Sequence, residues 1–279
     1  MPKPLLITLA CTTCILISSI IVWIIWGNSA LIKSDYRISS GYLPHSFDGF
    51  VIAQVSDLHN CEFGKHNENL LNLLRDAKPD VIAITGDFVD SRRTNIAVSI
   101  DFVKQAVKIA PCYYVTGNHE SRISQYPELK QALITAGVTV LDDQCQEIEL
   151  AENKINIIGL NDPKFSDGDE RKNTKAKLQS LVPDNDNFTI LLTHRPELFD
   201  LYVNAGIDLI LAGHAHGGQI RLPALGGVIA PNQGLFPKYD AGMFQEENSQ
   251  MIVSRGLCDT VFPPRINNKP ELVVITLTS

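Results

Sequence analysis

The stretch VIAITGDFVD, residues 81–90, decides how this chain folds. Its first half, Val81–Thr85, is short, apolar and rich in β-branched residues, and this composition predicts a strand. The strand ends at Gly86-Asp87, and a second carboxylate, Asp90, follows three residues later. Glycine at a strand end lets the backbone turn sharply and approach a ligand. The stretch therefore predicts a strand that presents acidic side chains to a binding site.

The same arrangement, an apolar strand followed by a polar cluster, occurs four more times. Strands are expected at 51–55, 112–116, 189–193 and 209–212, and the clusters at their ends are Ser56-Asp57-Leu58-His59, Gly117-Asn118-His119-Glu120, Thr193-His194 and Gly213-His214-Ala215-His216-Gly217-Gly218. Loops at the carboxyl ends of strands in one parallel sheet form the usual crevice for ligands. We therefore expect the five clusters to converge on a single site.

Helical stretches alternate with the strands in the first half of the chain. Helices are expected at 68–77, 96–110 and 127–136, and this alternation predicts an α/β domain with a largely parallel sheet. The second half is richer in strands, which are expected at 138–141, 148–150, 155–160, 251–254 and 272–276. Residues 222–239 contain several glycines and prolines among apolar residues, and they are expected to form a loop.

Composition limits the classes of function. Hydrophobic residues make up 44% of the 279 residues and charged residues 20%, which is typical of a globular protein. The net charge of -7 repels polyanions, so no nucleic-acid partner is expected. A phosphate-bearing substrate would need local positive charge, which bound metal ions would supply.

The six cysteines form neither a disulfide framework nor a zinc-thiolate motif. Two lie in the first apolar segment, and the other four are scattered along the chain without a C-x-x-C pair: Cys61, Cys112, Cys145 and Cys258. Four free thiols and two disulfides are both compatible with this pattern, so the sequence leaves the redox compartment open.

The N-terminal segment is predicted to be a membrane anchor. Residues 5–26 contain neither a charge nor a proline, and as a helix they would span about 33 Å, close to the thickness of the bilayer core. Trp23 and Trp26 stand at one end, as interfacial aromatics do. A cleaved signal usually has a shorter apolar stretch and a better cleavage site than residues 27–30 provide. We therefore expect a retained anchor.

The expected organisation is an anchor at 1–30, a linker at 31–49 and a catalytic domain at 50–279. Flanking charges give a near tie for orientation, since Lys3 lies on one side and Lys33 and Arg37, offset by Asp35, on the other. The short N-terminus favours a single-pass cell-membrane protein whose domain lies outside the cytoplasm.

Residue types and spacing in the clusters suit metal ions. Residues two apart in an extended segment point the same way, so Asp57 and His59 can hold one ion together. His214 and His216 share that spacing, but the surrounding glycines let each face a different ion. Carboxylate, amide and imidazole ligands suit divalent Mn, Fe or Zn. Each cluster alone is compatible with a structural role, such as a helix cap at Asp57, but five together favour a metal site.

The motifs D-x-H, G-D-x-x-D, G-N-H-[DE], H and G-H-x-H occur here in the order typical of the calcineurin-like metallophosphoesterases, and the chain resembles that family from about residue 50 to 276. Residues 213–223 and 234–239 are similar to its bacterial membrane-associated branch, the YkuE/YaeI type. The resemblance implies a four-layer α/β/β/α sandwich with two facing sheets, and two divalent metal ions as cofactors.

The family resemblance also implies a role for each site residue. One ion would be held by Asp57, His59 and His216, the other by Asn118, His194 and His214, with Asp87 as the bridge. His119 would donate a proton or hydrogen bond to the phosphoryl group, and Asp90 would orient His119. Ser91-Arg92 replaces the Arg-Gly of the protein phosphatases of the family, which argues against that activity.

The sequence thus predicts a metal-dependent phosphoesterase that uses a metal-bridging hydroxide on a phosphomonoester, phosphodiester or pyrophosphate. The anchor and the apolar residues of 222–239 suggest a lipid-linked or envelope substrate, such as the UDP-diacylglucosamine cleaved by pyrophosphatases of related branches. The alternative is a catalytically silent phosphoesterase-fold scaffold. Such proteins usually lack metal ligands, whereas every ligand position is filled here. A redox or thiolate-zinc protein is disfavoured by the scattered cysteines.

Overall fold

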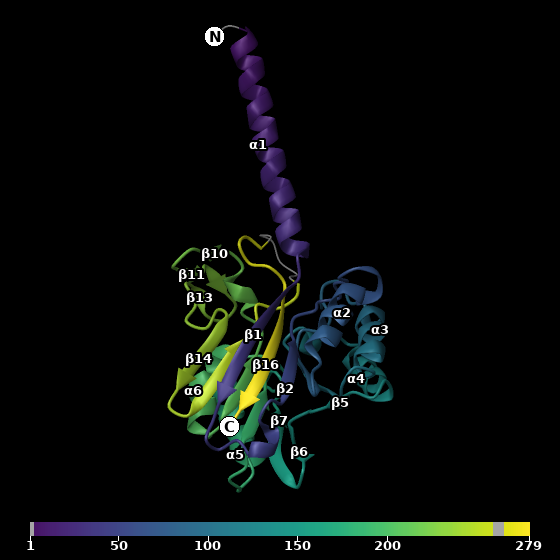
Figure 1. Ribbon diagram of the computed structural model, residues 1–279, viewed down its shortest axis with the longest axis vertical. Coiled ribbons are helices and arrows are strands. Elements are labelled where there is room, and N and C mark those ends of the chain that lie inside the picture. Colours follow the sequence, from purple (N-terminus) through teal and green to yellow (C-terminus); the bar gives the residue numbers. More distant parts are fainter. Residues whose placement is uncertain (1–2, 259–264) are drawn as a thin grey trace.

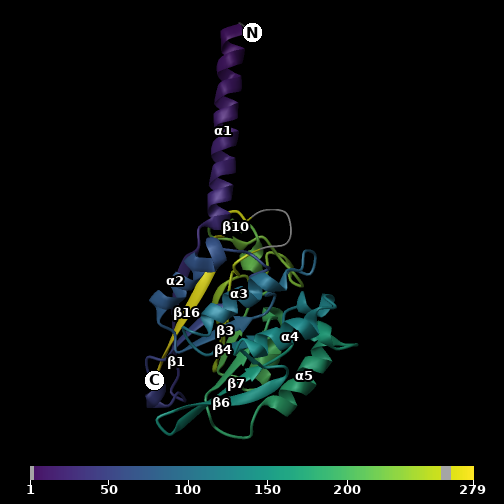
Figure 2. The ribbon, with the colours of Figure 1, turned by 90° about the vertical axis from the view of Figure 1, so that its right-hand side faces the viewer.

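The computed structural model describes residues 3–258 and 265–279, so residues 1–2 of the expected anchor and 259–264 of the expected domain lie outside it. Helix α1 (Lys3–Ser29) projects away from the remaining elements (Figure 1). Those elements form two facing six-stranded sheets with helices on both outer sides (Figures 1 and 2). The predicted four-layer α/β/β/α architecture is confirmed.

The first sheet has the strand order β1-β16-β2-β3-β4-β5. Strands β2 to β5 run parallel, β16 is antiparallel to β2, and β1 is parallel to β16. The bounds are β1 (Ile32–Ser39), β2 (Val51–Val55), β3 (Val81–Thr85), β4 (Cys112–Val115), β5 (Thr139–Val140) and β16 (Glu271–Thr278). The predicted strands 51–55 and 81–85 match β2 and β3 at both ends.

Strand β1 lies within the segment 31–49 that was expected to be a linker. All eight of its residues pair with β16, so this segment belongs to the sheet. The strand occupies the sheet edge, and its side chains, apart from Ile38, are exposed or half-buried. Such an edge strand carries polar residues, and its sequence IKSDYRIS therefore lacks the apolar run that marked the central strands.

Three helices cover the outer face of the first sheet: α2 (Glu68–Ala77), α3 (Ile96–Ala106) and α4 (Tyr126–Thr135). Helix α2 has the predicted bounds, whereas α3 ends four residues before the predicted end at 110. Its continuation closes in tight turns, with hydrogen bonds from Lys108 N–H to Gln105 O and from Ile109 N–H to Ala106 O. These turns bring the chain to Pro111, which starts the approach to β4.

The second sheet has the order β14-β15-β9-β8-β7-β6, in which β7, β8, β9 and β15 run parallel and both edge strands are antiparallel. Its strands are β6 (Gln144–Leu150), β7 (Asn153–Gly159), β8 (Thr189–Leu192), β9 (Leu209–Ala212), β14 (Gly242–Glu246) and β15 (Ser249–Val253). Helices α5 (Glu170–Leu181) and α6 (Phe199–Asn204) cover its outer face. Sequence analysis missed both, because α5 is mainly polar and α6 has only six residues.

An apolar layer between the sheets holds them face to face. Ile52 and Val115 of the first sheet pack there with Ile157 and Leu211 of the second, all buried. Gln54 adds a polar link across the same gap, because its side-chain amide donates to Ala212 O at the end of β9 (2.9 Å). This packing aligns the carboxyl ends of strands from both sheets.

Residues 222–239, expected to be a loop, contain two short hairpins. Strands β10 (Arg221–Leu222) and β11 (Gly226–Gly227) form one, and β12 (Ile229–Ala230) and β13 (Gly234–Leu235) form the other. They lie at the end of the domain from which α1 emerges (Figure 1). Leu225, Leu235 and Phe236 expose 67%, 68% and 59% of their surface there.

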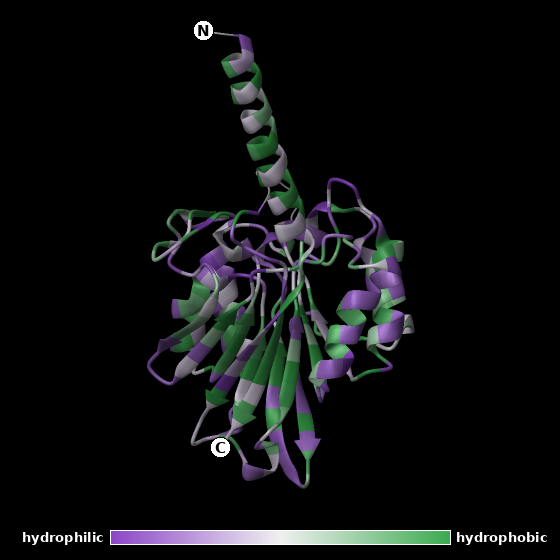
Figure 3. Cartoon of the chain, turned by 45° about the horizontal axis from the view of Figure 1, so that its top comes forward, coloured by the Kyte–Doolittle hydropathy of each residue, from purple (hydrophilic) through white to green (hydrophobic). Residues whose placement is uncertain are grey.

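Helix α1 is long and apolar enough to cross a membrane. Hydrophobic residues predominate along it, and it stands clear of the domain (Figure 3). Its end is tied to the domain through Asn28, whose side chain donates to Arg265 O (2.9 Å) and accepts from Arg265 N–H (3.0 Å). Strand β1 then begins three residues after the helix ends.

Candidate metal centre

The five polar clusters meet at one end of the sandwich. Three follow β2, β3 and β4 of the first sheet, and two follow β8 and β9 of the second. The expectation of one shared sheet is therefore corrected: the clusters converge because two sheets face each other. In two groups of side chains, potential ligand atoms lie within 4.8 Å of one another: Asp57, His59, Asp87 and His216 in one, and Asp87, His194 and His214 in the other.

Asp87 belongs to both groups and is buried. Its Oδ2 lies 3.1 Å from His194 Nε2 and 3.7 Å from His59 Nε2, and its Oδ1 accepts the His119 backbone N–H (2.7 Å). Burial alone would raise the pKa of the Asp87 carboxyl, but the charge of His194 and its hydrogen bond outweigh burial and hold that pKa well below its usual range. Asp87 is thus an ionised carboxylate at the centre of the cluster.

Asp57 forms the second buried carboxylate. Its Oδ1 lies 3.4 Å from His216 Nε2 and 3.9 Å from His59 Nε2. Its Oδ2 accepts the Ser56 hydroxyl (2.5 Å), and both oxygens lie 3.3 Å from the His214 backbone nitrogen. Donors from two clusters therefore fix this carboxylate while its Oδ1 faces the histidines.

Backbone carbonyls orient two of the imidazoles. His194 Nδ1 lies 2.8 Å from Thr85 O, and His216 Nδ1 lies 3.1 Å from Cys258 O. A carbonyl only accepts hydrogen bonds, so Nδ1 carries the proton in each ring. This leaves each Nε2 directed at the carboxylates, which is how proteins commonly prepare a histidine for a metal.

The residues present fit divalent cations. Asn118 Oδ1 is buried and accepts no hydrogen bond from any described residue, which is costly for an amide oxygen unless a cation or donor binds it. Burial opposes the charged form of His194, but Asp87 and Asp57 raise its pKa to about 10. The cluster therefore carries excess negative charge, and its carboxylate, amide and imidazole donors are those that divalent transition metals bind.

The backbone at the cluster is unusual. Asp57, His59, Asp87, His214 and His216 all have positive φ, between 45° and 67°. For residues with a side chain this region costs about 1–3 kcal/mol each and is concentrated at functional sites. It also redirects successive side chains, so the extended D-x-H geometry expected from spacing alone does not apply. Because the backbone turns at these positions, Asp57 and His59 both reach the same group of potential ligands.

Two glycines allow the loops to approach one another. A Cβ on Gly117 would lie 2.2 Å from Asp87 Oδ1, and a Cβ on Gly213 would lie 2.0 Å from Ser56 Oγ and 2.6 Å from Asp57 Oδ2. Any larger residue at either position would displace a carboxylate of the cluster.

His119 borders the cluster, with Nε2 3.9 Å from Asp87 Oδ2. Its Nδ1 accepts the Ser91 backbone N–H (3.0 Å), and the Ser91 hydroxyl lies equally close. Asp90 Oδ1 is farther, at 3.6 Å. Ser91, which the sequence analysis did not select, is thus the hydrogen-bond partner of the ring, while Asp90 accepts Arg92 N–H. In the neutral ring the proton is therefore on Nε2.

Glu120 is a buried acid that holds two clusters together. Its Oε1 accepts N–H groups of Phe88 (2.7 Å) and Val89 (3.1 Å), and its Oε2 accepts those of Asp87 (3.0 Å) and Gly117 (2.7 Å). Sequence analysis placed Glu120 in one of the polar clusters but assigned it no role. Burial and the nearby Asp87 carboxylate raise its pKa to about 7, while the N–H donors lower it.

Arg195 is a further residue that sequence analysis missed. It is buried, pairs with Asp162 and Glu197, and its Nη1 lies 3.4 Å from His214 Nε2. Burial, His194 and Arg195 together lower the pKa of His214 well below its usual range. His214 is therefore a neutral imidazole, the form that binds metals. The only sequence signal for Arg195 was its position directly after His194.

A disulfide joins two loops beside the cluster. Cys61, two residues after His59, is bonded to Cys258, and their Cα atoms are 6.2 Å apart. Cys112 and Cys145 are free thiols. The chain thus has one disulfide, which differs from both patterns left open by the sequence. Since Cys258 O is also the partner of His216 Nδ1, the bond supports the orientation of a cluster histidine.

Comparisons with known proteins agree with this geometry. A family model described as calcineurin-like phosphoesterase matches residues 50–218. The chain is 32% identical to the uncharacterized metallophosphoesterase YkuE of Bacillus subtilis (strain 168), with 88% of this chain and 85% of that protein covered. It is 27% identical to the phosphodiesterase YaeI of Escherichia coli (strain K12), with 82% of each chain covered. The crystal structure of TT1561 of Thermus thermophilus has a similar fold (TM-score 0.52, 14% identity, 75% of this chain and 90% of that chain covered).

Proposed function

The chain belongs to the calcineurin-like phosphoesterase family and is a hydrolase of phosphoester bonds, and from this premise we propose that it is a membrane-tethered enzyme with two metal ions bridged by Asp87. One observation carries the proposal. Asp87 is the residue shared by both groups of potential ligands, so one carboxylate can contact two ions at once.

We assign the ligands as follows. Asp57, His59 and His216 hold one ion, Asn118, His194 and His214 hold the other, and Asp87 joins them. The donor set suits Mn, Fe or Zn. Bound ions of this kind supply Lewis-acid stabilisation of phosphoryl charge and lower the pKa of water.

The residues of the chain have separate tasks in this proposal. Asp57 and Asp87 provide negative charge that selects cations, and imidazole side chains complete each group. His119 stands beside Asp87 with its Nε2–H available, and it would donate a hydrogen bond or proton toward the leaving oxygen. Such proton transfer typically contributes about 10²–10⁴-fold to rate. Ser91 keeps the ring in the orientation that this donation needs.

Two variants of the full chain test these assignments. Asp87→Asn should lose bound metal and hydrolysis of a chromogenic phosphodiester together, because both groups depend on this carboxylate. His119→Ala should keep its metal and lose rate. His66→Ala is the matched control, since His66 lies on the surface and pairs with Asp101. Wild-type metal content and turnover in Asp87→Asn would refute the bridge, and full metal with no hydrolysis of any ester in wild type would favour the silent scaffold.

We propose that the catalytic domain lies outside the cytoplasm, on a single-pass anchor. Disulfides persist in oxidising compartments and are rare in the cytosol, so the Cys61–Cys258 bond supports this orientation. Maleimide labelling of unreduced cells should modify neither cysteine, whereas labelling after reduction with a membrane-impermeant reductant should modify both. Labelling of both without any reductant would contradict the orientation.

We further propose an amphipathic, lipid-linked phosphate ester as substrate. The apolar hairpins pack against the metal-centre loop, because Val228 N–H donates to Gly218 O (3.0 Å). Exposed Leu225, Leu235 and Phe236 thus stand beside the reacting end of the domain. A panel of esters with one headgroup and increasing acyl length, presented in mixed micelles, should give rising kcat/KM. Faster cleavage of the water-soluble member would exclude this substrate class.

A further inference from the structure

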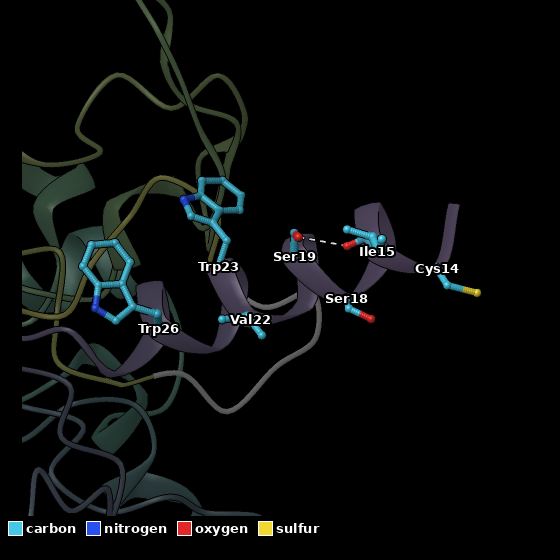
Figure 4. Close-up of a pocket in the computed structure, with 7 residues that line it drawn as sticks. All are labelled: Cys14, Ile15, Ser18, Ser19, Val22, Trp23 and Trp26. Carbon is cyan, nitrogen blue, oxygen red and sulfur yellow. Dashed lines mark hydrogen bonds between the residues drawn. The ribbon is translucent and has the colours of Figure 1, made fainter. Parts of the chain in front are cut away.

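A cavity of ≈ 190 Å³ lies where α1 joins the domain. Its helix side is formed by the last turns of α1. Figure 4 shows the indole rings of Trp23 and Trp26 projecting from these turns. Its domain side is formed by Arg255 and by residues of the segment 265–269. The residues that matter for its chemistry are Trp23, Trp26, Arg255, Arg265, Asn268 and Lys269.

The two walls of the cavity are held together. Asn28 and Arg265 exchange two hydrogen bonds, from Asn28 Nδ2 to Arg265 O and from Arg265 N to Asn28 Oδ1. Lys269 Nζ lies 4.1 Å from the centre of the Trp26 ring, a cation–π contact between domain and helix. The position of the indoles relative to the cations is therefore set by specific contacts.

The cavity is cationic in a chain of net charge -7. Three cationic side chains line it, and none of the lining residues that the structure describes is acidic. The nearest counter-charge to Arg255 is Glu271, at 3.8 Å from its Nε, and that carboxylate also accepts from Ser34 and the Arg255 backbone. Lys269 has no acidic partner among the described residues within ion-pair distance. Lys269 therefore brings a positive charge to the cavity that no described carboxylate pairs with.

We propose that this cavity binds the phosphate of an anionic phospholipid headgroup, supplied by the bilayer that α1 enters. Tryptophans concentrate at the headgroup level of membranes, and cationic side chains next to a membrane helix attract anionic lipids. Here guanidinium and ammonium groups face a lipid phosphate, while Trp23 and Trp26 contact the glycerol and the first acyl carbons. The inference rests on the membrane tether proposed above and does not depend on the phosphoesterase activity.

Lipid binding at this position would orient the metal centre. Asn268, which lines the cavity, donates to His216 O (2.7 Å) and to Gln219 O (3.2 Å). Arg265 also bonds Cys258 O, the carbonyl that faces His216. Only Asn268 therefore separates a headgroup in the cavity from the loop that carries His216. The apolar hairpins lie at the same end of the domain.

The chain contains only two tryptophans, and both line the cavity, so intrinsic fluorescence reports its occupancy directly. Full-length protein in neutral detergent is titrated with phosphatidylglycerol or with phosphatidylcholine of the same acyl chains. We expect a saturable change of tryptophan emission with phosphatidylglycerol alone. Lys269→Gln should weaken the apparent affinity about fivefold, and Lys269→Glu should abolish the change. Lys108→Gln, which changes an exposed lysine in the turns after α3, should behave as wild type.

Three results would overturn the assignment. Equal responses to the two lipids would show that headgroup charge is not recognised. Wild-type affinity in both Lys269 variants would exclude the cationic cavity. Inorganic phosphate that produces the same change and displaces phosphatidylglycerol would identify a free-anion site. Thermal unfolding of each variant provides the folding control, and Arg255→Gln, expected to weaken binding by a similar factor, replaces any Lys269 variant that does not fold.

Discussion

The metal centre and the apolar end of this protein, formed by α1 and the short hairpins, differ from the usual distribution of buried and exposed residues in opposite ways. At the metal centre, charged and polar side chains such as Asp57, Asp87 and His194 are almost fully buried. At the other region, formed by α1 and the hairpins of 221–235, apolar side chains such as Leu225 and Trp26 are largely exposed. Buried charge and exposed apolar surface both cost free energy in water.

Both costs would fall on contact with a partner outside the chain. A cation compensates buried carboxylates, and a bilayer compensates exposed apolar groups. The two regions are also physically joined: Cys258, bonded to Cys61 beside the metal centre, accepts a hydrogen bond from Arg265, and Arg265 in turn bonds Asn28 of α1. Variants that break the connection, and then those that alter each region, should lower the free energy of unfolding by progressively smaller amounts.

Loss of the disulfide should have the largest effect. Cys61→Ser/Cys258→Ser opens a covalent loop with a sequence separation of 197 residues, and removal of such a link costs about 2–5 kcal/mol. Urea unfolding of this double variant and of wild type measures the change. Cys145→Ser, which removes a half-buried free thiol, is the control and should unfold near wild type. An unchanged midpoint in the double variant would mean that this bond does not constrain the domain.

Gly117→Ala should damage the metal centre next most severely. The new Cβ would overlap Asp87 Oδ1, so either the loop or the carboxylate must shift. We expect a loss of about 1–3 kcal/mol in stability and about 10²-fold in hydrolysis, with reduced bound metal. Gly41→Ala meets no atom within 4 Å and should change neither quantity. Retained metal and rate in Gly117→Ala would show that the loops have more freedom than this packing implies.

These residues also show what the sequence could predict. Central strands such as Val81–Thr85 were predictable because burial on both faces requires a continuous apolar run. The candidate ligands were predictable because five clusters of acids, histidines and asparagine each follow a predicted strand, a recurrence that turn formation alone does not require. The roles of Ser91, Glu120 and Arg195 were not predictable, since each acts through contacts with residues that turned backbone brings close. The positive φ values of Asp57 and Asp87 determine which residues come into contact, and the spacing of residues in the sequence does not predict these φ values.

Glu120→Gln should have an intermediate effect. Glu120 accepts four backbone N–H groups, two on each oxygen, and an amide can accept on one side only. Two buried N–H groups would lose their acceptor, which should cost about 2 kcal/mol. Glu128→Gln, on the exposed side of α4, is the control. Thermal unfolding and metal content are measured together, and wild-type values for both would remove Glu120 from its positioning role.

The smallest effect on stability should come from the apolar hairpins, and it sharpens the comparison most directly. Leu235→Ser/Phe236→Ser replaces side chains that are already exposed, so the free energy of unfolding in water should change by less than about 0.5 kcal/mol. Binding to the bilayer should respond instead, because each side chain removed from lipid forfeits about 1.5–3 kcal/mol of apolar burial. Quenching of tryptophan emission by brominated phosphatidylcholine in nanodiscs measures how closely the domain approaches the membrane. Met243→Ser, equally apolar and 49% exposed on the edge strand β14, is the control and should leave quenching unchanged. If the double variant loses stability but keeps full quenching, the hairpins belong to the folded core and the two regions differ less than proposed; the reverse result assigns their exposed surface to the bilayer.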